Sequence, residues 1–226
     1  MPELKELLVD ELQDLLNAES QIAGVLPKMV EAAHCTRLKS ALEKHLVQTE
    51  KHVERARSAL EMLGGDGQSK PCHGIKGILD EGQERMRETR EKDEFAADLA
   101  LIAAAQKVEH YEISAYGTAH RLAKQIGEQE VAKMLSHTLG EEEATDFLLT
   151  EVAKPLLHDA TVAEFGDESK SPWGEIGDTA SETQLEKNHG RVTSGRGVHA
   201  RGKENQSVAA AAGEGSIGGP TRKARG

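Results

Sequence analysis

The sequence predicts an all-α fold: a four-helix bundle built from two antiparallel hairpins, with a long crossover that carries a short helix. Four segments of about 30 residues repeat apolar side chains at alternating spacings of three and four, which is typical of helices with one buried face. Short joints connect the segments within each pair, whereas a connection of about 30 residues separates the two pairs. A long crossover between two hairpins is one of the known topologies of four-helix bundles.

The first segment, residues 3–34, predicts a long helix with one carboxylate in its apolar row. Glu19 occupies the centre of this row, which reads Leu8, Leu12, Leu15, Glu19, Ile22, Leu26 and Met29. Gly24 and Pro27 interrupt the segment, but the apolar period continues beyond them. We therefore expect a bend there rather than the end of the helix.

The second segment, residues 36–63, again places polar residues in the middle of its row. The row reads Leu38, Leu42, His45, Thr49, His52, Ala56, Ala59 and Leu63. Gln48 and His52 are one turn apart and share a face. Thr36 is the expected N-cap, and the turn-forming residues 64–71 end the helix.

The third long helix is expected at about 94–126, after a short amphipathic helix at about 74–91 in the crossover. Two carboxylates, Glu109 and Glu112, interrupt its apolar row, which continues through Tyr116. Burying ionised carboxylates without partners is costly, so such groups pair, take up a proton or bind a cation.

The fourth long helix follows Gly127 and is expected to run to about 158. Its predicted row also contains two acids, and reads Ala132, Leu135, Leu139, Glu142, Asp146, Leu149 and Ala153. Glu141 and Glu143 flank this row, and we expect both on the solvated surface. We assign residues 1–160 to the bundle and residues 161–226, which hold 12 of the 22 glycines, to a disordered tail.

Composition excludes several classes of function. The formal net charge of -11 argues against a nucleic-acid binder, and no apolar run is long enough for a transmembrane helix. The first residues do not resemble a secretory signal. We expect Cys35 and Cys72 to be free thiols in a cytoplasmic protein, although a disulfide between them is an alternative.

The polar interruptions of the four rows fall at one height. In antiparallel hairpins Glu19 should meet the Gln48–His52 turn, and Glu109 should meet the Glu142–Asp146 turn. Independent core defects would scatter, so this coincidence predicts one shared site. Inward carboxylates with imidazole on facing helices are the arrangement of di-iron and di-manganese bundles.

The predicted metal ligands are Glu19, Gln48, His52, Glu109, Glu112, Glu142 and Asp146. Their donors suit two divalent ions, with iron expected and manganese or zinc as alternatives. A purely structural polar network, in which His45, Tyr111 and Tyr116 satisfy the acids, is the other interpretation. We expect His110 outside the site. The tighter of the two positions should lie on the Glu109–Glu142–Asp146 side.

The sequence resembles the YciF-like family of ferritin-like proteins, bacterial proteins that contain a domain of unknown function. The resemblance spans about residues 5–155. It rests on LLVDELQDLLNAESQI (7–22), HLVQTEKHVERA (45–56), LIAAAQKVEHYEISAYGTAHRLA (101–123) and TLGEEEATD (138–146). It implies a ferritin-like bundle, a dinuclear metal site, homodimers and a link to bacterial stress. Relatives often have Glu where Gln48 stands, and Gln is a weaker ligand for which His52 could compensate.

Two kinds of function follow from this prediction. In the first, the site oxidises Fe(II) with O₂ or peroxide, or removes peroxide, and Tyr111 or Tyr116 supports the ligands. In the second, the chain is a non-enzymatic stress or interaction protein in which the metal or polar cluster is structural. Storage of iron in a cage is disfavoured, since no fifth-helix pattern offers a contact for a cage.

Overall fold

The computed structural model describes residues 2–65, 67–89 and 91–166, and these form five helices without a strand. The helices are α1 (Pro2–Ala32), α2 (Thr36–Met62), α3 (His73–Thr89), α4 (Glu94–Ile126) and α5 (Gln129–Phe165). The predicted all-α bundle is therefore confirmed. Helix α5 runs beyond the expected end near residue 158. The segment predicted as a tail lies, from residue 167 on, outside the described residues.

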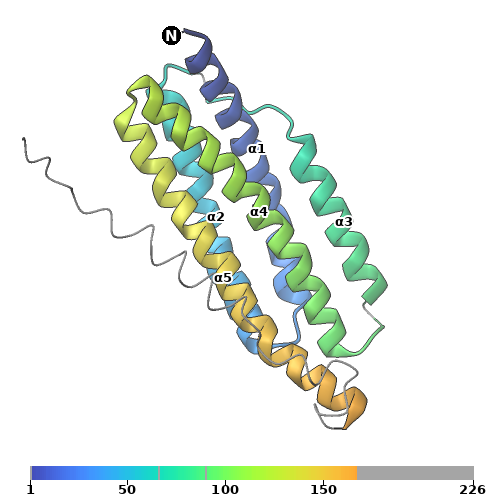
Figure 1. The fold of residues 1–226 in the computed structure, drawn as a ribbon. Coiled ribbons are helices and arrows are strands. Elements are labelled where there is room, and N and C mark those ends of the chain that lie inside the picture. Colours follow the sequence, from blue (N-terminus) through green and yellow to red (C-terminus); the bar gives the residue numbers. More distant parts are fainter. Residues whose placement is uncertain (1, 66, 90, 167–226) are drawn as a thin grey trace, which may run out of the picture. The chain divides into compact units, whose positions relative to one another are not determined.

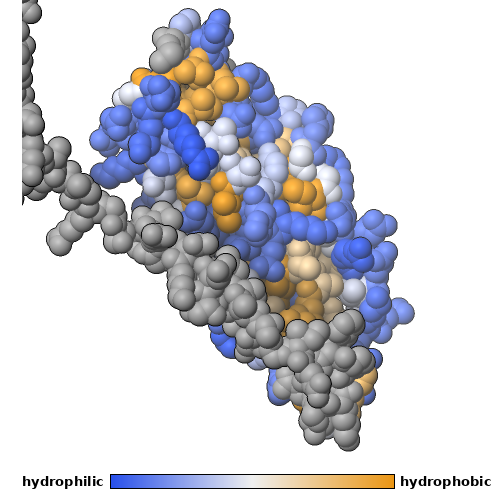
Figure 2. Space-filling view, in the orientation of Figure 1, coloured by the Kyte–Doolittle hydropathy of each residue, from blue (hydrophilic) through white to orange (hydrophobic). Residues whose placement is uncertain are grey.

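The four long helices form the bundle, and α3 covers one of its sides (Figure 1). Helix α1 packs mainly against α2, and α4 packs mainly against α5, as expected for two hairpins. The hairpins meet through contacts of α1 with α4 and of α2 with α5. Helix α3, which belongs to the crossover, packs on α4 and α1. The face in Figure 2 is largely hydrophilic, with separate hydrophobic patches.

The core consists of two apolar clusters. One includes Leu8, Leu12 and Leu15 of α1 together with Leu135 of α5. The other includes Ile22 and Leu26, about two and three turns beyond Leu15 on α1, with α3 residues and Leu149 of α5. Glu19 lies between these two stretches of α1, so a polar layer separates the two apolar clusters.

The end of α4 explains the tight turn of the second hairpin. Gly127, with φ of 86°, ends α4, and Glu128 N–H donates to Ala123 O at 3.0 Å, which closes a Schellman motif. A left-handed residue at this position strongly favours glycine. The joint of the second hairpin is therefore tight, because α5 begins two residues after Gly127.

The start of α2 differs from the prediction. Cys35, not Thr36, is the N-cap, and it makes no side-chain cap hydrogen bond. The buried carboxylate of Asp98, on α4, instead accepts from His34 N–H at 2.9 Å and from Cys35 N–H at 2.6 Å. An acid from the other hairpin thus caps the joint between α1 and α2.

Hydrogen bonds also hold the crossover against α1. Asn17 Oδ1 accepts from Cys72 N–H at 2.8 Å, and Tyr111 Oη donates to Asp14 Oδ2 at 2.7 Å while lying 2.9 Å from Cys72 Sγ. A Cβ atom at Gly74 would lie 3.0 Å from Cε2 of Tyr111. Both cysteines are free, as expected.

Candidate metal centre

Six titratable side chains from four helices meet in the polar layer. Each is at most 2% exposed, and they are Glu19 of α1, His45 and His52 of α2, Glu109 and Glu112 of α4, and Glu142 of α5. Each lies at an apolar-row position of its own helix, so the amphipathic pattern that buries the neighbouring leucines also buries these groups.

The cluster divides into two groups of candidate ligands. Single donor atoms of His45, Glu109, Glu112 and Glu142 lie within 4.8 Å of one another. A second group of the same kind contains Glu19, His52 and Glu142. Glu142 belongs to both groups, so its carboxylate would be shared if each group held a cation.

Hydrogen bonds do not satisfy the cluster. Among the described residues, eight buried side-chain nitrogen and oxygen atoms lack a hydrogen-bond partner, and all eight belong to these six residues. Both carboxylate oxygens of Glu112 and of Glu142 are among them. Since nearly all buried polar atoms in proteins are hydrogen-bonded, such a concentration indicates a site for a bound group.

Short distances nevertheless join acids to imidazoles. His45 Nε2 lies 3.1 Å from Glu109 Oε1, and His52 Nδ1 lies 2.7 Å from Glu142 Oε1 and 3.5 Å from Glu19 Oε1. Tyr116 Oη donates to Glu19 Oε1 at 2.5 Å. In the metal-free protein, therefore, protons shared between imidazoles and carboxylates offset part of the buried charge.

The acids hold their protons more tightly than usual. Burial raises the pKa of Glu109 to about 7, with a further rise from Glu142, against the opposing effect of His45. Burial, together with the charges of neighbouring carboxylates, raises the pKa of Glu112 well above its usual value. Burial also raises the pKa of Glu19, although His52 and Tyr116 oppose the rise. Bound cations would relieve this repulsion.

The histidines also take up protons easily. Burial alone would lower the pKa of His52, but the carboxylates of Glu142 and Glu19 beside its Nδ1 raise it to about 10. Burial would also lower the pKa of His45, but the negative charge of Glu109 beside its Nε2 outweighs burial, so the pKa of His45 is raised. Metal ions must displace these protons, so metal binding should depend on pH.

The donor set has the composition of a dinuclear carboxylate bundle, but the helices contribute it differently. In the usual arrangement two helices carry one Glu each, and the other two each carry a Glu-x-x-His motif. Here Thr49 stands three residues before His52, and Thr145 stands three residues after Glu142. The remaining donors come from His45 and Glu109 instead, so four carboxylates and two imidazoles are still present.

Five of the seven predicted ligands meet in the cluster: Glu19, His52, Glu109, Glu112 and Glu142. Gln48 is half-buried, and its role as a ligand stays a prediction. Asp146 lies apart, and its Oδ1 accepts from Gln106 Nε2 at 3.0 Å and lies 3.4 Å from His110 Nε2. His110 is largely exposed, which agrees with its expected position outside the site.

Asp146 lies apart because the inward row of α5 differs from the predicted row. The buried residues include Thr138, Thr145 and Val152, whereas Leu139, Asp146 and Ala153 are only partly buried. The two rows share Ala132, Leu135, Glu142 and Leu149. At the other three positions the buried residue precedes the predicted one by a single residue. From the sequence, Asp146 is the better candidate for a ligand because it carries a carboxylate. In the structure, Thr145 is the residue that faces the bundle.

Two site residues were missing from the predicted ligand set. His45 is expected mainly as a hydrogen-bond partner, with contact to the metal as the lesser alternative, although its place in the apolar row is the available signal. Glu141 was expected on the solvated surface, but its side chain is only 22% exposed and Oε2 lies 3.0 Å from His52 Nε2. Its contact with Arg55 also involves this oxygen, and no spacing in the sequence indicates it.

Known proteins are similar to this chain in sequence. The family described as a domain of unknown function, DUF892, matches residues 3–162. Protein YciF of Escherichia coli K12 is 39% identical over 154 residues, which cover 68% of this chain and 92% of YciF. The range matched by the family includes all six cluster residues.

Solved structures agree with these matches. The Escherichia coli stress protein YciF has a TM-score of 0.63 at 36% identity, covering 70% of this chain and 98% of YciF. YcfI of Rhodopseudomonas palustris also has a TM-score of 0.63 at 36% identity, covering 65% of this chain and 92% of YcfI. A Xanthomonas campestris protein, 22% identical with a TM-score of 0.55, covers 71% and 96% and shares the fold.

Proposed function

We propose that this chain, which belongs to the DUF892 family of YciF-like proteins, binds two divalent metal ions in its polar layer. Iron is the proposed metal, with manganese and zinc as alternatives. We further propose that the loaded site oxidises Fe(II) with O₂ or peroxide, or removes peroxide. Since YciF is called a stress protein, we extend a role in bacterial stress to this chain.

One observation carries the proposal: the eight buried atoms without hydrogen-bond partners, all contributed by the six cluster residues. Leaving a buried polar group unsatisfied costs about 1–3 kcal/mol, and more for a charged group. The unsatisfied groups all lie at one place in the fold. There, the donor atoms of each ligand group lie within 4.8 Å of one another, close enough to contact one ion. Coordination of cations would offset the costs there.

Charge and donor type support divalent iron or manganese. Four ionised carboxylates with two neutral imidazoles balance two divalent ions. Oxygen and nitrogen donors suit iron, manganese and zinc, whereas sulfur donors would favour softer metals. Neither cysteine belongs to the two ligand groups, and the Cys72 sulfur instead lies beside the Tyr111 hydroxyl.

The bound ions would supply electrons to O₂ or peroxide, and the surrounding residues would control the reaction. Tyr116, which is 1% exposed, donates a hydrogen bond to Glu19 and so fixes the orientation of this carboxylate. The apolar clusters on both sides limit access of water. Glu109 and Glu112, whose pKa values are raised, would exchange protons for metal when the site is loaded.

A second candidate function is a structural site without catalysis. Its support is the deep burial of the cluster, in which Glu19, Glu112 and Glu142 are each 0% exposed. Only a small reactant such as O₂ or peroxide could enter without rearrangement of the bundle. In this alternative the metal holds the two hairpins together, and surface residues bind a partner.

We also propose a cytoplasmic homodimer. No helix in the described ranges is long and apolar enough to cross a membrane. Phe147 of α5 is 66% exposed and Val47 of α2 is 51% exposed. The 3.4 Å contact between His45 and Thr145 brings these parts of the two helices to one level. Apolar exposure of this kind supports a protein contact.

Metal analysis tests the proposal. The purified full chain is stripped with a chelator, reloaded with Fe(II) without oxygen, and its bound metal is measured. We expect about two ions per chain, and then consumption of O₂ or peroxide. Fewer than about 0.2 ions per chain would overturn both metal-based functions. Full loading without consumption of either oxidant would overturn the catalytic function and leave the structural one.

A further inference from the structure

Glu141 contacts the cluster from its outer side. Glu142, the next residue of α5, lies 2.7 Å from Nδ1 of His52, whereas Glu141 lies 3.0 Å from Nε2 of the same ring. Two consecutive carboxylates therefore contact opposite nitrogens of one imidazole. Of these two acids, Glu142 is fully buried and Glu141 is 22% exposed.

This arrangement decides which nitrogen His52 can offer to a metal. A ligating nitrogen must be unprotonated, and the hydrogen bond made by the other nitrogen sets the tautomer. Because Glu141 accepts from Nε2–H, Nδ1 remains as the ligand. Nδ1 is also the atom nearest to Glu19, at 3.5 Å, within the second ligand group.

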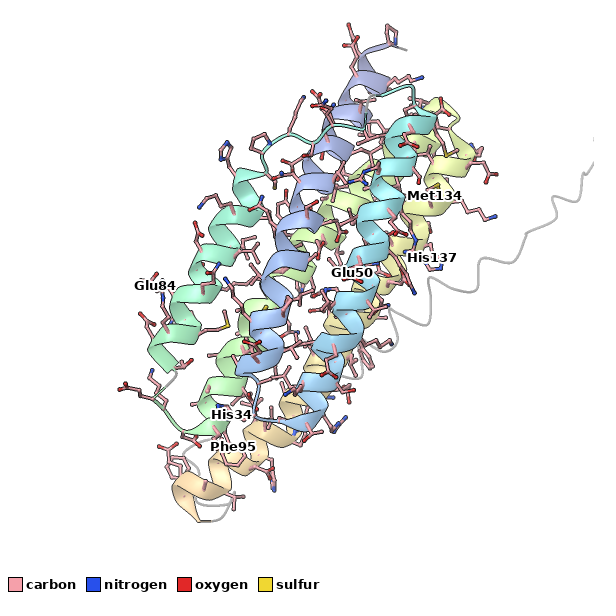
Figure 3. All side chains as sticks on the ribbon, turned by 180° about the vertical axis from the view of Figure 1, so that it is seen from behind. His34, Glu50, Glu84, Phe95, Met134 and His137 are labelled. Atoms are coloured by element: carbon pink, nitrogen blue, oxygen red, sulfur yellow. The ribbon has the colours of Figure 1, made fainter. Side chains whose placement is uncertain are left out.

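Arg55 holds Glu141 in this position. Arg55 Nη1 contacts Glu141 Oε2 and donates to Thr138 Oγ1 at 3.3 Å. On the outer side, His137 Nδ1 lies 3.2 Å from the same carboxylate oxygen and is 62% exposed; Figure 3 labels it on α5. Arg55 follows His52 by three residues, so α2 supplies both the ring and the cation that fixes its partner.

The other histidine has a weaker partner. His45 Nδ1 lies 3.4 Å from Thr145 Oγ1, near the limit of a hydrogen bond, and 3.9 Å from Glu142 Oε2. No ionic pair like that of Arg55 and Glu141 orients the His45 ring within the described part of the chain. The two halves of the cluster therefore differ in how firmly the imidazole is positioned.

We infer that Arg55 and Glu141 are positioning residues for His52, and that they set the metal affinity of the Glu19–His52–Glu142 group selectively. The pair holds the ring so that Nδ1 faces the two carboxylates. This inference rests on the proposed metal binding. The inference favours the Glu19–His52–Glu142 group as the tighter position, the opposite of the side expected from the sequence, where Asp146 lies outside the cluster.

Titration with Co(II), which accepts oxygen and nitrogen donors and absorbs visible light, tests the inference. The metal-free full chain is titrated, and binding is followed by calorimetry and by the ligand-field spectrum. We expect two binding steps for the parent chain. Glu141→Ala should weaken one step by about 10–100-fold and leave the other within about twofold, because only His52 loses its partner.

Two further variants separate positioning from charge and fold. Glu141→Gln retains an oxygen that accepts from Nε2–H, so it should recover most of the lost affinity. Glu143→Ala removes the same charge from the other side of Glu142, at an exposed position, and should bind as the parent does. Arg55→Gln should weaken the same step as Glu141→Ala, by a smaller factor, and serves where the alanine variant does not fold.

The outcomes are distinguishable. A parent chain that binds two ions, with both steps unchanged in Glu141→Ala, would overturn the inference and leave the proposed function intact. Equal weakening of both steps, or equal effects of Glu141→Ala and Glu143→Ala, would also overturn it. A parent chain that binds no metal would overturn the proposed function and the inference together.

Discussion

At the scale of single residues, Glu112 shows the conflict between stability and metal binding. It is fully buried, and neither carboxylate oxygen has a hydrogen-bond partner. Its pKa lies well above the usual value because of burial and three neighbouring acids. Such a residue destabilises the fold, and a cation bound as proposed would offset this cost.

Glu112→Gln should therefore stabilise the metal-free protein while weakening metal binding. The amide keeps the shape, carries no charge and can donate to orphaned oxygens of neighbouring acids. We expect a gain of about 1–2 kcal/mol, which corresponds to a rise in Tm of about 2–8 °C. Thermal unfolding of stripped samples at pH 8 measures the gain, and metal analysis should show a loss of at least one ion. A lower Tm than the parent would contradict this account.

Asp98 is a buried acid of the opposite kind, because both of its oxygens accept backbone hydrogen bonds. Asp98→Asn replaces one acceptor by a donor and leaves one N–H of the α1–α2 joint unsatisfied. The expected cost is about 1–3 kcal/mol in the free energy of unfolding.

Urea unfolding measures this cost, with Asp93→Asn as the matched control. Asp93 is the N-cap of α4, where its side chain accepts from Phe95 N–H, and Asn caps helices about as well as Asp. The control should therefore change stability by only a few tenths of a kcal/mol. Similar losses in both variants would show that Asp98 is an ordinary cap.

At the scale of helices, α3 depends on a close approach to Tyr111. The ring of Tyr111 occupies the space that a side chain at Gly74 would need. The same tyrosine contacts Asp14 and Cys72 through its hydroxyl. Displacing it would therefore disturb α1, the crossover and α4 at once.

Gly74→Ala should destabilise the protein by about 1–3 kcal/mol because the new methyl group must displace the tyrosine ring. Gly77→Ala is the control in the same helix, since nothing lies within 4 Å of its added Cβ. There the substitution should be neutral or stabilising by about 0.5–1 kcal/mol. Chemical denaturation compares both with the parent. Equal effects at the two positions would remove the role assigned to Tyr111.

The sequence predicted the helices well because their apolar period is long and regular. The rows of the first two helices are confirmed, including Glu19, His45 and His52. The row of α5 was predicted less well, since small polar residues such as Thr145 can face either a core or solvent. Only the neighbouring helices decide between adjacent positions such as Thr145 and Asp146.

The site could be located from the sequence to the correct turn of each helix, but its contacts could not. The level shared by Glu19 and Glu142 follows from helix length and direction alone. Contacts between helices, such as His52 with Glu141 and His45 with Glu109, depend on helix rotation and side-chain conformation. Neither helix rotation nor side-chain conformation can be predicted from the spacing of residues in one sequence.

At the scale of the whole molecule, the cluster makes stability depend on pH. The pKa of Glu109 is raised to about 7 and that of His52 to about 10 in the folded protein. Between about pH 4.5 and 10 the folded state therefore binds more protons than the unfolded state, and stability falls as pH rises. Glu141, whose pKa is lowered to about 2 by Arg55 and His52 against partial burial, acts in the opposite sense only below this range.

The Tm of the stripped protein should therefore decrease steadily from pH 5.5 to pH 9. Metal should reverse part of this trend, because its binding releases protons and so strengthens as pH rises. Thermal unfolding with and without metal, at constant ionic strength, checks both statements. A stripped protein that becomes more stable toward pH 9 would contradict the assigned protonation of the cluster.

The polar layer between the two apolar clusters has a consequence for local unfolding. Each cluster draws residues from both hairpins, so either end of the bundle has its own cooperative contacts. Without metal the two ends should open as separate units, which amide hydrogen exchange would resolve as two classes of protection. Metal bound between them would couple the units, and the slowest amides at both ends should then exchange together.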